Sequence, residues 1–454
     1  MYTLLFITAA AVGGRLAGAT VGAPECEIPE ERKAAAAIVA MGGTVNLRDG
    51  RVLEVGAPWE RKQLTDTEMP LLAHFHDVRW IALARSPITD DGLAHLAGLK
   101  KLAILDLDGD AITDRGLEIL GRIESLEYLT LSRTKISGAG LKALAHLKHL
   151  RQLLLEGTQA GDEGMRYVAV HSELICLSTG ERTTPDGLAL IEGLAQLENL
   201  SVPRGTDEAA LAHLARMKSL RWISGFKITS DAGLRHVGNL TGLFNLDLRE
   251  SRITDGGLRH IEGLTKLQTL DLRKSSVKDG GLRYLARMRD LDCLDLSGTA
   301  VGDSGLANLA GLARITHLRL ARTRVTDAAL RYVSAMTRLA NLDLSRTAVT
   351  DAGLASLAGL SSLQSLELGF TRVTDAGLLA LKPLKQLNEL SLAGTGVTNA
   401  GMPALAALPR LERLSLLKTK VTSVGVEGLR RDLKGLYLIE LEYPKDFMES
   451  FSDQ

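Results

Sequence analysis

The sequence has few of the residues that most compact cores and covalent cross-links require. Phe, Trp and Tyr make up 4% of the 454 residues, while all hydrophobic residues together make up 45%. Any core must therefore consist mainly of Leu, Ile, Val and Ala. Three cysteines, Cys26, Cys176 and Cys293, are too few for a disulfide framework, and we expect all of them to be free thiols.

The chain also lacks an excess of charge and a long apolar run. Lys plus Arg and Asp plus Glu number 54 each, which argues against a nucleic-acid-binding protein with a strongly basic face. No segment approaches the 18 or so uninterrupted apolar residues of a membrane-spanning helix. The sequence therefore predicts neither a nucleic-acid partner nor an integral membrane segment.

Sequence motifs of catalysis and of cofactor binding are absent as well. We find no P-loop, no glycine-rich dinucleotide turn after a strand, no G-x-S-x-G and no H-E-x-x-H. His74 and His76 have no cysteine or carboxylate pair at metal-ligand spacing beside them. His95, His213, His236 and His260 recur with the repeat described next, so we expect them on helix surfaces. The prediction is a non-enzyme without metal or cofactor.

What the sequence does contain is one leucine-rich pattern, repeated about every 24 residues. A clear copy begins at Leu243 and continues Phe-Asn-Leu-Asp-Leu-Arg-Glu-Ser to residue 251, where Leu243 is position one and Ser251 position nine. The pattern returns at positions that share an aliphatic residue: Val78, Leu102, Leu126, Leu150, Leu267, Leu291, Ile315, Leu339, Leu363, Leu387 and Leu411. A period of 20 to 29 residues is typical of a solenoid built from strand-plus-helix repeats.

Each repeat predicts one strand, at positions three to seven, followed by one helix. Positions four and six point into the core, while positions three, five and seven point outward. Consecutive strands pair in parallel, because a helix-containing crossover separates them. Since helices are about twice as wide as the spacing between strands, the array must curve into a horseshoe with the sheet on its concave side. The predicted fold class is α/β.

Polar residues recur at two further places in the repeat. Position nine is Thr or Ser in most repeats, and its hydroxyl can bond to the backbone where the chain leaves the strand. Each helix begins with a Thr-Asp-x-Gly-Leu element, such as residues 350–354, whose Thr or Asp can cap the helix. Its glycine costs about 1 kcal/mol of helix propensity, which close approach to the neighbouring repeat would explain.

The pattern divides the chain into four parts. Residues 1–25 contain a short apolar run followed by small residues, which resembles a secretory leader. Residues 26–64 contain a helix and a hairpin around Asp49-Gly50, suited to cap the first repeat. Residues 65–441 hold about 16 repeats, the last counted from Leu433, and residues 442–454 form a polar tail. Within the repeats, residues 166–230 are irregular: three repeats are 23 residues long, their strands match the pattern poorly, and Pro203 lies just past one of them.

The L-x-x-L-x-L-x-x-T frame with T-D-A-G-L resembles leucine-rich repeat proteins over about 375 residues. It is closest to bacterial proteins with 24-residue TDAGL repeats, and is similar to the cysteine-containing repeats of F-box substrate receptors. It differs from the latter by Thr instead of Cys at position nine and by lacking an F-box pattern in residues 26–64. The resemblance implies protein–protein recognition and names no ligand.

Outward strand positions on the concave sheet supply the first candidate binding surface. Charged residues recur at positions five and seven: Asp247, Arg249, Asp271, Arg273, Asp295, Arg319, Asp343 and Glu367. Carboxylates stacked at about 5 Å repel one another, and the neighbouring guanidinium groups would offset that repulsion. The alternative is that Leu-Asp-Leu-Ser is simply a common sequence for a soluble strand in this kind of repeat and has no role in binding.

Aromatic residues supply a second candidate surface. Trp80 and Tyr128 fall at position three of early strands, and Trp222 and Phe226 lie in the irregular middle. Exposed Trp and Tyr are favoured in interface hot spots. The alternative is that the N-terminal cap covers Trp80 or that Trp222 turns inward.

Three functions remain open. The leading one is a non-catalytic protein-interaction scaffold, bacterial and exported (periplasmic or extracellular) if residues 1–25 are a cleaved leader, and cytoplasmic otherwise. The second is the substrate-recognition subunit of a ubiquitin-ligase-type complex, and the third a structural cell-envelope protein. The sequence does not identify the protein partner.

Overall fold

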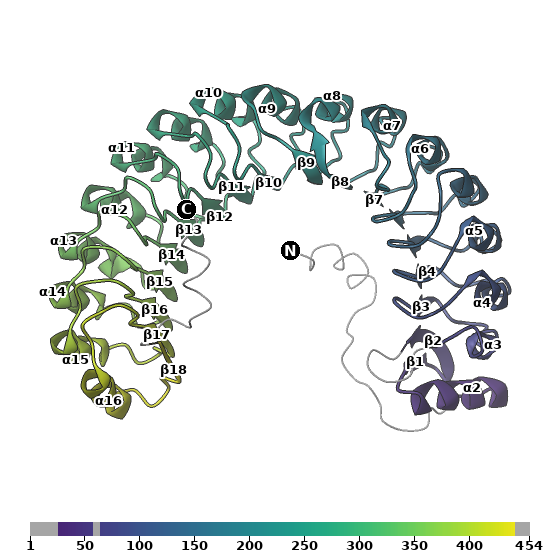
Figure 1. Cartoon of the computed structure of the whole chain (residues 1–454), viewed down its shortest axis with the longest axis horizontal. Helices are drawn as coiled ribbons and strands as arrows, with labels where there is room; N and C mark the ends of the chain where they lie inside the picture. The colour runs from purple at the N-terminus through teal and green to yellow at the C-terminus, as the bar shows by residue number, and fades with distance from the viewer. Residues whose placement is uncertain (1–25, 58–63, 441–454) are drawn as a thin grey trace. The chain divides into compact units, whose positions relative to one another are not determined.

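A computed structural model describes residues 26–57 and 64–440 of this chain. The chain divides into two compact units, Met1–Lys227 and Ile228–Gln454. In each unit the strands lie along the inner side and the helices along the outer side (Figure 1). The leader expected at 1–25 and the tail expected at 442–454 lie outside the described residues.

The first unit opens with a helix and a hairpin, α2 (Pro29–Ala40), β1 (Thr44–Arg48) and β2 (Arg51–Gly56). Asp49 and Gly50 both have positive φ, 51° and 68°, as a two-residue hairpin turn requires. The predicted Asp-Gly turn is therefore confirmed. Strand β2 then pairs in parallel with the strand at residues 80–82, so the hairpin begins the sheet of this unit.

The remaining elements of the first unit alternate strand and helix. The strands are β3 (Trp80–Ala82), β4 (Ile104–Asp106), β5 (Tyr128–Thr130), β6 (Gln152–Leu154), β7 (Cys176–Ser178), β8 (Asn199–Asp207) and β9 (Trp222–Lys227). The α-helices are α3 (Met69–Leu72), α4 (Asp90–Leu93), α5 (Asp114–Leu120), α6 (Asp162–Val168), α7 (Pro185–Leu190) and α8 (Leu211–Leu214), with 3-10 helices η1 (Ala94–Leu96), η2 (Ala139–Leu144) and η3 (Glu208–Ala210). Strands β1 to β9 form one sheet in chain order.

The second unit repeats the same alternation. Its strands are β10 (Asn245–Asp247), β11 (Thr269–Asp271), β12 (Cys293–Asp295), β13 (His317–Arg319), β14 (Asn341–Asp343), β15 (Ser365–Glu367), β16 (Glu389–Ser391), β17 (Arg413–Ser415) and β18 (Leu438–Glu440). Its α-helices are α9 (Asp231–Val237), α10 (Asp255–Leu258), α11 (Asp303–Leu306), α12 (Asp327–Val333), α13 (Asp351–Leu354), α14 (Asp375–Leu378), α15 (Met402–Leu405) and α16 (Ser423–Asp432). The 3-10 helices are η4 (Arg259–Ile261), η5 (Asp279–Leu285), η6 (Ala307–Leu309), η7 (Ala355–Gly359), η8 (Leu379–Leu381) and η9 (Asn399–Gly401).

Parallel pairing and the inward positions are as predicted, but the strands are shorter. Leu246 and Leu248, at positions four and six, are buried, while Asp247 between them is exposed. Regular strands cover three residues instead of the predicted five. The chain leaves the sheet because position eight, here Glu250, has a left-handed φ of 57°.

The irregular middle differs from the prediction in one respect. The 23-residue spacing is confirmed, since Cys176 pairs with Asn199 and Asn199 with Trp222. Strand β8, however, is nine residues long and includes Pro203, which we expected just past the strand. A register shift between Ser201 and Thr206 accommodates the proline, which has no N–H to donate.

The last repeat begins later than the sequence indicated. Leu414, at position four of its repeat, pairs with Ile439, so position one of the final repeat is Leu436 and not Leu433. The final spacing is therefore 25 residues, one longer than the regular period. The apolar pattern alone placed the start of this repeat three residues too early.

Position nine performs the predicted role in most repeats. The hydroxyl of Thr347 donates to the carbonyl of Leu344 over 2.6 Å, and the same bond recurs at Thr134, Thr158, Thr299, Thr323, Thr371, Thr395 and Thr419. Ser275 makes no such bond, although its oxygen is buried. The hydroxyl thus adds a second hydrogen bond to a carbonyl that, in most of these repeats, also accepts the backbone N–H of the same threonine.

On the helix side, the aspartate of each Thr-Asp-x-Gly-Leu element joins its repeat to the next. Asp351 Oδ1 accepts the backbone N–H of Thr374 at 2.7 Å, and Oδ2 accepts the hydroxyl of Thr374 at 2.6 Å. Thr350 caps α13 by accepting the N–H of Ala352 at 3.3 Å. The predicted cap is therefore made by Thr, while the Asp links repeats. We call this the aspartate ladder.

The glycine of the element is explained by the ladder. A Cβ at Gly353 would overlap Oδ1 of Asp327, the ladder carboxylate of the preceding repeat. Close approach to the neighbouring repeat, predicted from the helix-propensity cost, is thus confirmed. In α12 the corresponding residue is Ala329, and the Asp303–Thr326 bonds are still made at 2.8 and 2.6 Å, so one methyl group can be accommodated.

Truncating an inward leucine should destabilise the second unit. We expect Leu344→Ala to lower the free energy of unfolding by about 2–5 kcal/mol, because Leu344 is fully buried. Leu379→Ala is the matched control, since Leu379 is 56% exposed. Urea denaturation followed by circular dichroism measures both, and equal effects of the two substitutions would contradict the buried repeat core.

Removing one ladder carboxylate should also destabilise, by a smaller amount. Asp351→Ala leaves the Thr374 N–H without its partner, and we expect a loss of about 1–2 kcal/mol. Asp351→Asn should lose less, because Asn399 occupies the same ladder position in its repeat and accepts the N–H of Thr422 in the following repeat at 2.9 Å. An alanine variant as stable as the native chain in urea would show that the ladder contributes nothing.

Candidate functional site

The sheet register of the second unit brings the predicted charged residues into one column. Asp247, Asp271, Asp295, Arg319, Asp343 and Glu367 are partners on successive strands β10 to β15. Arg249 and Arg273 follow two residues after the first two of these aspartates. The structure therefore places all eight charged candidates on the inner face of one unit.

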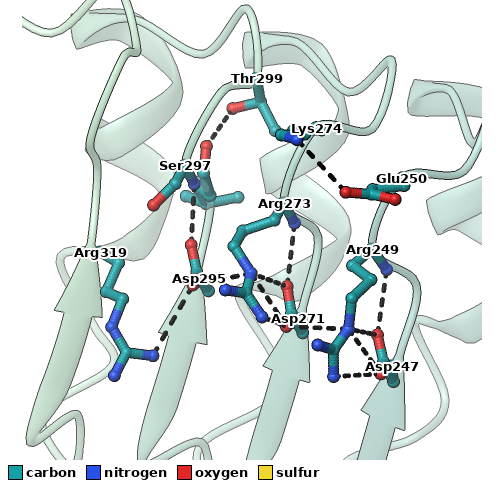
Figure 2. Close-up of polar contacts among 11 residues, drawn as sticks. Asp247, Arg249, Glu250, Asp271, Arg273, Lys274, Asp295, Ser297, Thr299 and Arg319 are labelled. Atoms are coloured by element: carbon teal, nitrogen blue, oxygen red, sulfur yellow. Dashed lines mark hydrogen bonds and ion pairs between the residues drawn. The ribbon is translucent and has the colours of Figure 1, made fainter. Parts of the chain in front are cut away.

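The two arginines bridge the aspartates of neighbouring strands (Figure 2). Arg249 donates to Asp247 at 2.5–2.9 Å and lies 3.7 Å from Asp271. Arg273 donates to Asp271 at 2.7 Å and lies 3.3 Å from Asp295. The pKa of each guanidinium is raised, chiefly by the hydrogen bond to its own aspartate. The expected offset of carboxylate repulsion is thus present.

Asp295 corrects the prediction, because its side chain is only 2% exposed. It lies between Arg273 and Arg319, whose nitrogens are 3.3 and 3.7 Å from its Oδ2 (Figure 2). Those two guanidinium groups, together with the N–H of Ser297, surround the carboxylate. Asp295 therefore orients arginines and cannot itself meet a partner.

The aspartates also have a local structural role. Asp247 and Asp271 each accept the backbone N–H two residues ahead, at 3.1 and 3.0 Å, and Asp343 does the same. These bonds satisfy backbone donors where the strand ends. The aspartates of the Leu-Asp-Leu pattern thus also have a structural role that the sequence did not predict, and the exposed charged candidates are Asp247, Arg249 and Arg319.

Glu367 of β15 lies in the same column, with Asp343 as its partner on the neighbouring strand. Burial raises its pKa, and the negative charges of Asp343, Glu389 and Glu440 raise it further, while a hydrogen bond from Ser391 opposes both. Glu367 therefore binds a proton more readily than an exposed glutamate does.

In the first unit, the aromatic candidates at position three form one column. Register places Trp80, Ile104, Tyr128, Gln152, Cys176, Asn199 and Trp222 on successive strands β3 to β9. The indole of Trp222 does not turn into the core, and the residue is half-buried like Trp80 and Tyr128. Phe226 lies in the extension of β9, paired with Thr206. The aromatic residues are thus on the inner face but spaced apart.

One repeat of the first unit contains three aspartates that the repeat pattern did not predict as a site. Asp106, Asp108 and Asp110 hold positions five, seven and nine, and Asp108 forms an ion pair with Arg133. Asp110 is 2% exposed, and burial raises its pKa to about 8. Neither oxygen of Asp110 has a hydrogen-bond partner at ordinary geometry, and the nearby Ser86 N–H offsets only part of the burial. The sequence signal for Asp110 is that most other repeats have Thr or Ser at position nine.

The described residues contain no group of three His, Cys, Asp or Glu side chains arranged to hold a metal ion. The three cysteines are free thiols, as predicted. Of the four repeat histidines, His95 is exposed and His213 contacts Glu192 at 2.9 Å. Within residues 26–57 and 64–440, no helix has the length and apolarity needed to cross a bilayer.

Comparison with known proteins identifies the family. A family model described as a leucine-rich repeat region matches residues 223–450, half of the chain, and a second leucine-rich repeat model matches residues 100–159. The chain therefore belongs to the leucine-rich repeat family. No curated protein matches the sequence.

Solved structures with the same fold come from bacteria and plants. An internalin from Listeria monocytogenes is 21% identical with a TM-score of 0.51, over 88% of this chain and 98% of its own. A leucine-rich repeat protein of Leptospira interrogans is 17% identical with a TM-score of 0.60, over 84% and 96%. The ectodomain of a membrane receptor kinase from Arabidopsis thaliana is 16% identical with a TM-score of 0.51, over 88% and 57%. The likeness is one of fold.

Replacing Asp110 should change how stability depends on pH. Because its folded pKa of about 8 is above the unfolded value of about 3.9, its contribution is most favourable at low pH and is lost as the pH rises towards 8. Asp110→Thr restores the common residue, so it should stabilise the chain more at pH 8 than at pH 5. Asp110→Asn should flatten the same dependence.

Urea denaturation at pH 5, 6.5 and 8 tests this expectation. A stability difference between Asp110→Thr and the native chain that is the same at all three pH values would contradict a buried, protonated carboxyl.

Proposed function

We propose that this chain is a non-catalytic protein-interaction scaffold that binds a protein partner on the inner, strand-lined faces of its repeats. Leucine-rich repeat proteins generally mediate protein–protein interaction, and the family supports the same role here. The fold displays outward strand positions in columns, which suits the recognition of an extended surface.

The observation that carries the proposal is the alternating chain of charges on β10 to β13. Arg249 and Arg273 are each held between two aspartates, so their guanidinium groups are ordered before any partner arrives. An ordered charge loses less conformational entropy on binding than a free side chain does. Exposed Arg249 and Arg319 flank this chain and would make the direct contacts.

The similar Arabidopsis ectodomain was solved in complex with Casparian strip integrity factor 2. That complex is an instance of partner binding by this fold and supports the same class of function for this chain. The aromatic residues Trp80, Tyr128, Trp222 and Phe226 belong to the proposed surface as secondary contacts in the first unit.

The finer assignments follow from the sequence pattern. We propose a bacterial protein of the TDAGL type, with residues 26–64 as an N-terminal cap, residues 65–441 as the repeats and residues 442–454 as a tail. We further propose that residues 1–25 act as a leader and that the protein is exported. The F-box-like and envelope-structural alternatives have no specific feature in their favour among the described residues.

A charge swap tests the inner face of the second unit. Asp271→Arg combined with Arg273→Asp keeps the net charge and allows an ion pair, but it reverses the order of charges along the column. We expect binding of the partner to weaken at least about tenfold, since misplaced interfacial charges cost a few kcal/mol. The control Arg259→Glu alters an exposed arginine of η4 on the helix side and should leave binding unchanged.

The partner is first identified by photo-cross-linking in the native cells, with the reactive amino acid placed at Arg319 or, for comparison, at Ala352 on the helix side. Affinity for the purified partner is then measured by calorimetry. Cross-links only from Ala352, or a charge-swapped chain of native affinity, would reject binding at the inner face.

A further inference from the structure

A second surface lies beside the charged column of the second unit, where the chain leaves each strand. Position eight has positive φ in every repeat of this unit from β10 to β17, including Arg322, Arg346, Phe370 and Lys418 at 54–57°. Glycine adopts this conformation without cost, whereas other residues pay about 1–2 kcal/mol. Large side chains at such a position indicate a use for them beyond local folding.

Most of these side chains, and those two positions later, are cationic. We call this set the basic row; it comprises exposed residues at positions eight and ten of the repeats that begin at residues 315, 339, 363 and 411: Arg322, Arg324, Arg346, Arg372, Lys418 and Lys420. Positions seven to twelve of these repeats, and of the one at 387 between them, contain no Asp or Glu. In a chain with equal numbers of acids and bases, this is a concentrated positive surface.

The surrounding carboxylates are occupied elsewhere. Asp327, Asp351 and Asp375, at position thirteen, accept hydrogen bonds from the following repeat in the aspartate ladder. Among described residues, no carboxylate lies within 4.0 Å of the cationic groups of Arg322, Arg324, Arg346, Arg372 or Lys420. The positive charge of these five residues is therefore not neutralised by a described carboxylate.

The N-terminal half of the same unit behaves differently. There Lys274, at position eight, forms an ion pair with Glu250 of the preceding repeat at 3.3 Å, visible in Figure 2. Arg249 and Arg273 are paired with aspartates, as described above. Lys274 at position eight is thus neutralised by an acid of the chain, whereas Arg322, Arg324, Arg346, Arg372 and Lys420 have no such ion pair among the described residues.

Phe370 organises part of the basic row. The guanidinium of Arg346 lies 4.2 Å from the centre of its ring, and Nζ of Lys418 lies 5.9 Å from it. The ring lies over Gly394, where an added Cβ would come within 2.5 Å of it. A glycine at that position leaves room for one aromatic ring to contact cations of a preceding and of a following repeat, and such contacts contribute about 0.5–1 kcal/mol each at exposed sites.

We propose that the basic row binds an extended acidic segment of a protein, with carboxylate or phosphate groups set against the arginines. Guanidinium groups bind both kinds of anion through paired hydrogen bonds. A single-stranded nucleic acid fits less well, because it needs free aromatic faces for its bases, and Phe370 is already flanked by cations of the chain itself. This surface is separate from the column proposed above and goes beyond that function.

Fluorescence anisotropy on the full chain tests the proposal with three labelled probes. They are a ten-residue glutamate-rich peptide, the same peptide with phosphoserine in place of half of its glutamates, and a ten-nucleotide oligo-thymidine. The variant Arg322→Gln, Arg346→Gln, Arg372→Gln removes three charges of the basic row. The matched control Arg259→Gln, Arg287→Gln, Arg289→Gln removes three exposed charges from the helix side and its adjoining turn.

We expect at least one acidic peptide to bind, the row variant to lose at least tenfold in affinity, and the control to stay within twofold. Preference for the phosphorylated or the unmodified peptide identifies the anion. The charge swap at Asp271 and Arg273 should leave peptide binding unchanged, which separates this surface from the inner-face site. Absence of peptide binding, equal loss in the control, or tighter row-dependent binding of oligo-thymidine would overturn the proposal.

Discussion

Every repeat of this chain has to meet its neighbour at two different distances. Strands approach to about 4.8 Å, whereas helices are about 10 Å wide, so the helix side cannot be closed by backbone pairing. The aspartate ladder solves this problem, since a carboxylate of one repeat reaches the N–H and hydroxyl of the next, as Asp351 reaches Thr374. Glycine at position 353 and its equivalents leaves the carboxylate room. The Thr-Asp-x-Gly-Leu elements of two successive repeats therefore act together: the Asp of one binds the Thr of the next, and the Gly of the next leaves space for that Asp.

The ladder also shows where the regular architecture ends. In the first unit Gly138 and Pro185 occupy ladder positions, and neither has a carboxylate to offer. Beyond Pro185 the repeat shortens to 23 residues, and strand pairing extends to compensate, with β8 and β9 longer than the regular strands. Gly225 has a φ of 89°, and an added Cβ there would overlap the carbonyl oxygen of Val202. The irregular middle thus has longer paired strands than the regular repeats, and side-chain hydrogen bonds such as that from Ser224 to Ser201 join its repeats as well.

Much of the fold could be predicted from the sequence, because each position of the repeat occurs many times along the chain. The inward leucines, parallel pairing, the Asp-Gly turn and the close approach at glycine all followed from averages over the repeats. Features that belong to a single repeat did not follow: the burial of Asp295 depends on arginines from two neighbouring strands, and the raised pKa of Asp110 depends on one substitution at position nine. The ladder itself was missed, because its two ends are 23 residues apart.

Repetition in register also determines how the charges of the candidate sites are arranged. In-register strands turn a repeated residue into a column of neighbours, so a repeated charge repels itself at about 5 Å. At β10 and β11 this cost is offset by arginines two residues after each aspartate, and the most enclosed carboxylate, Asp295 of β12, lies between Arg273 of the preceding repeat and Arg319 of the next strand. After β13 the repeats carry cations at positions eight and ten, and among described residues Arg322, Arg324, Arg346, Arg372 and Lys420 have no carboxylate within 4.0 Å, so an anionic partner would relieve their mutual repulsion. Since one unit contains both arrangements on the same framework, the difference between them reflects side-chain choice and not fold.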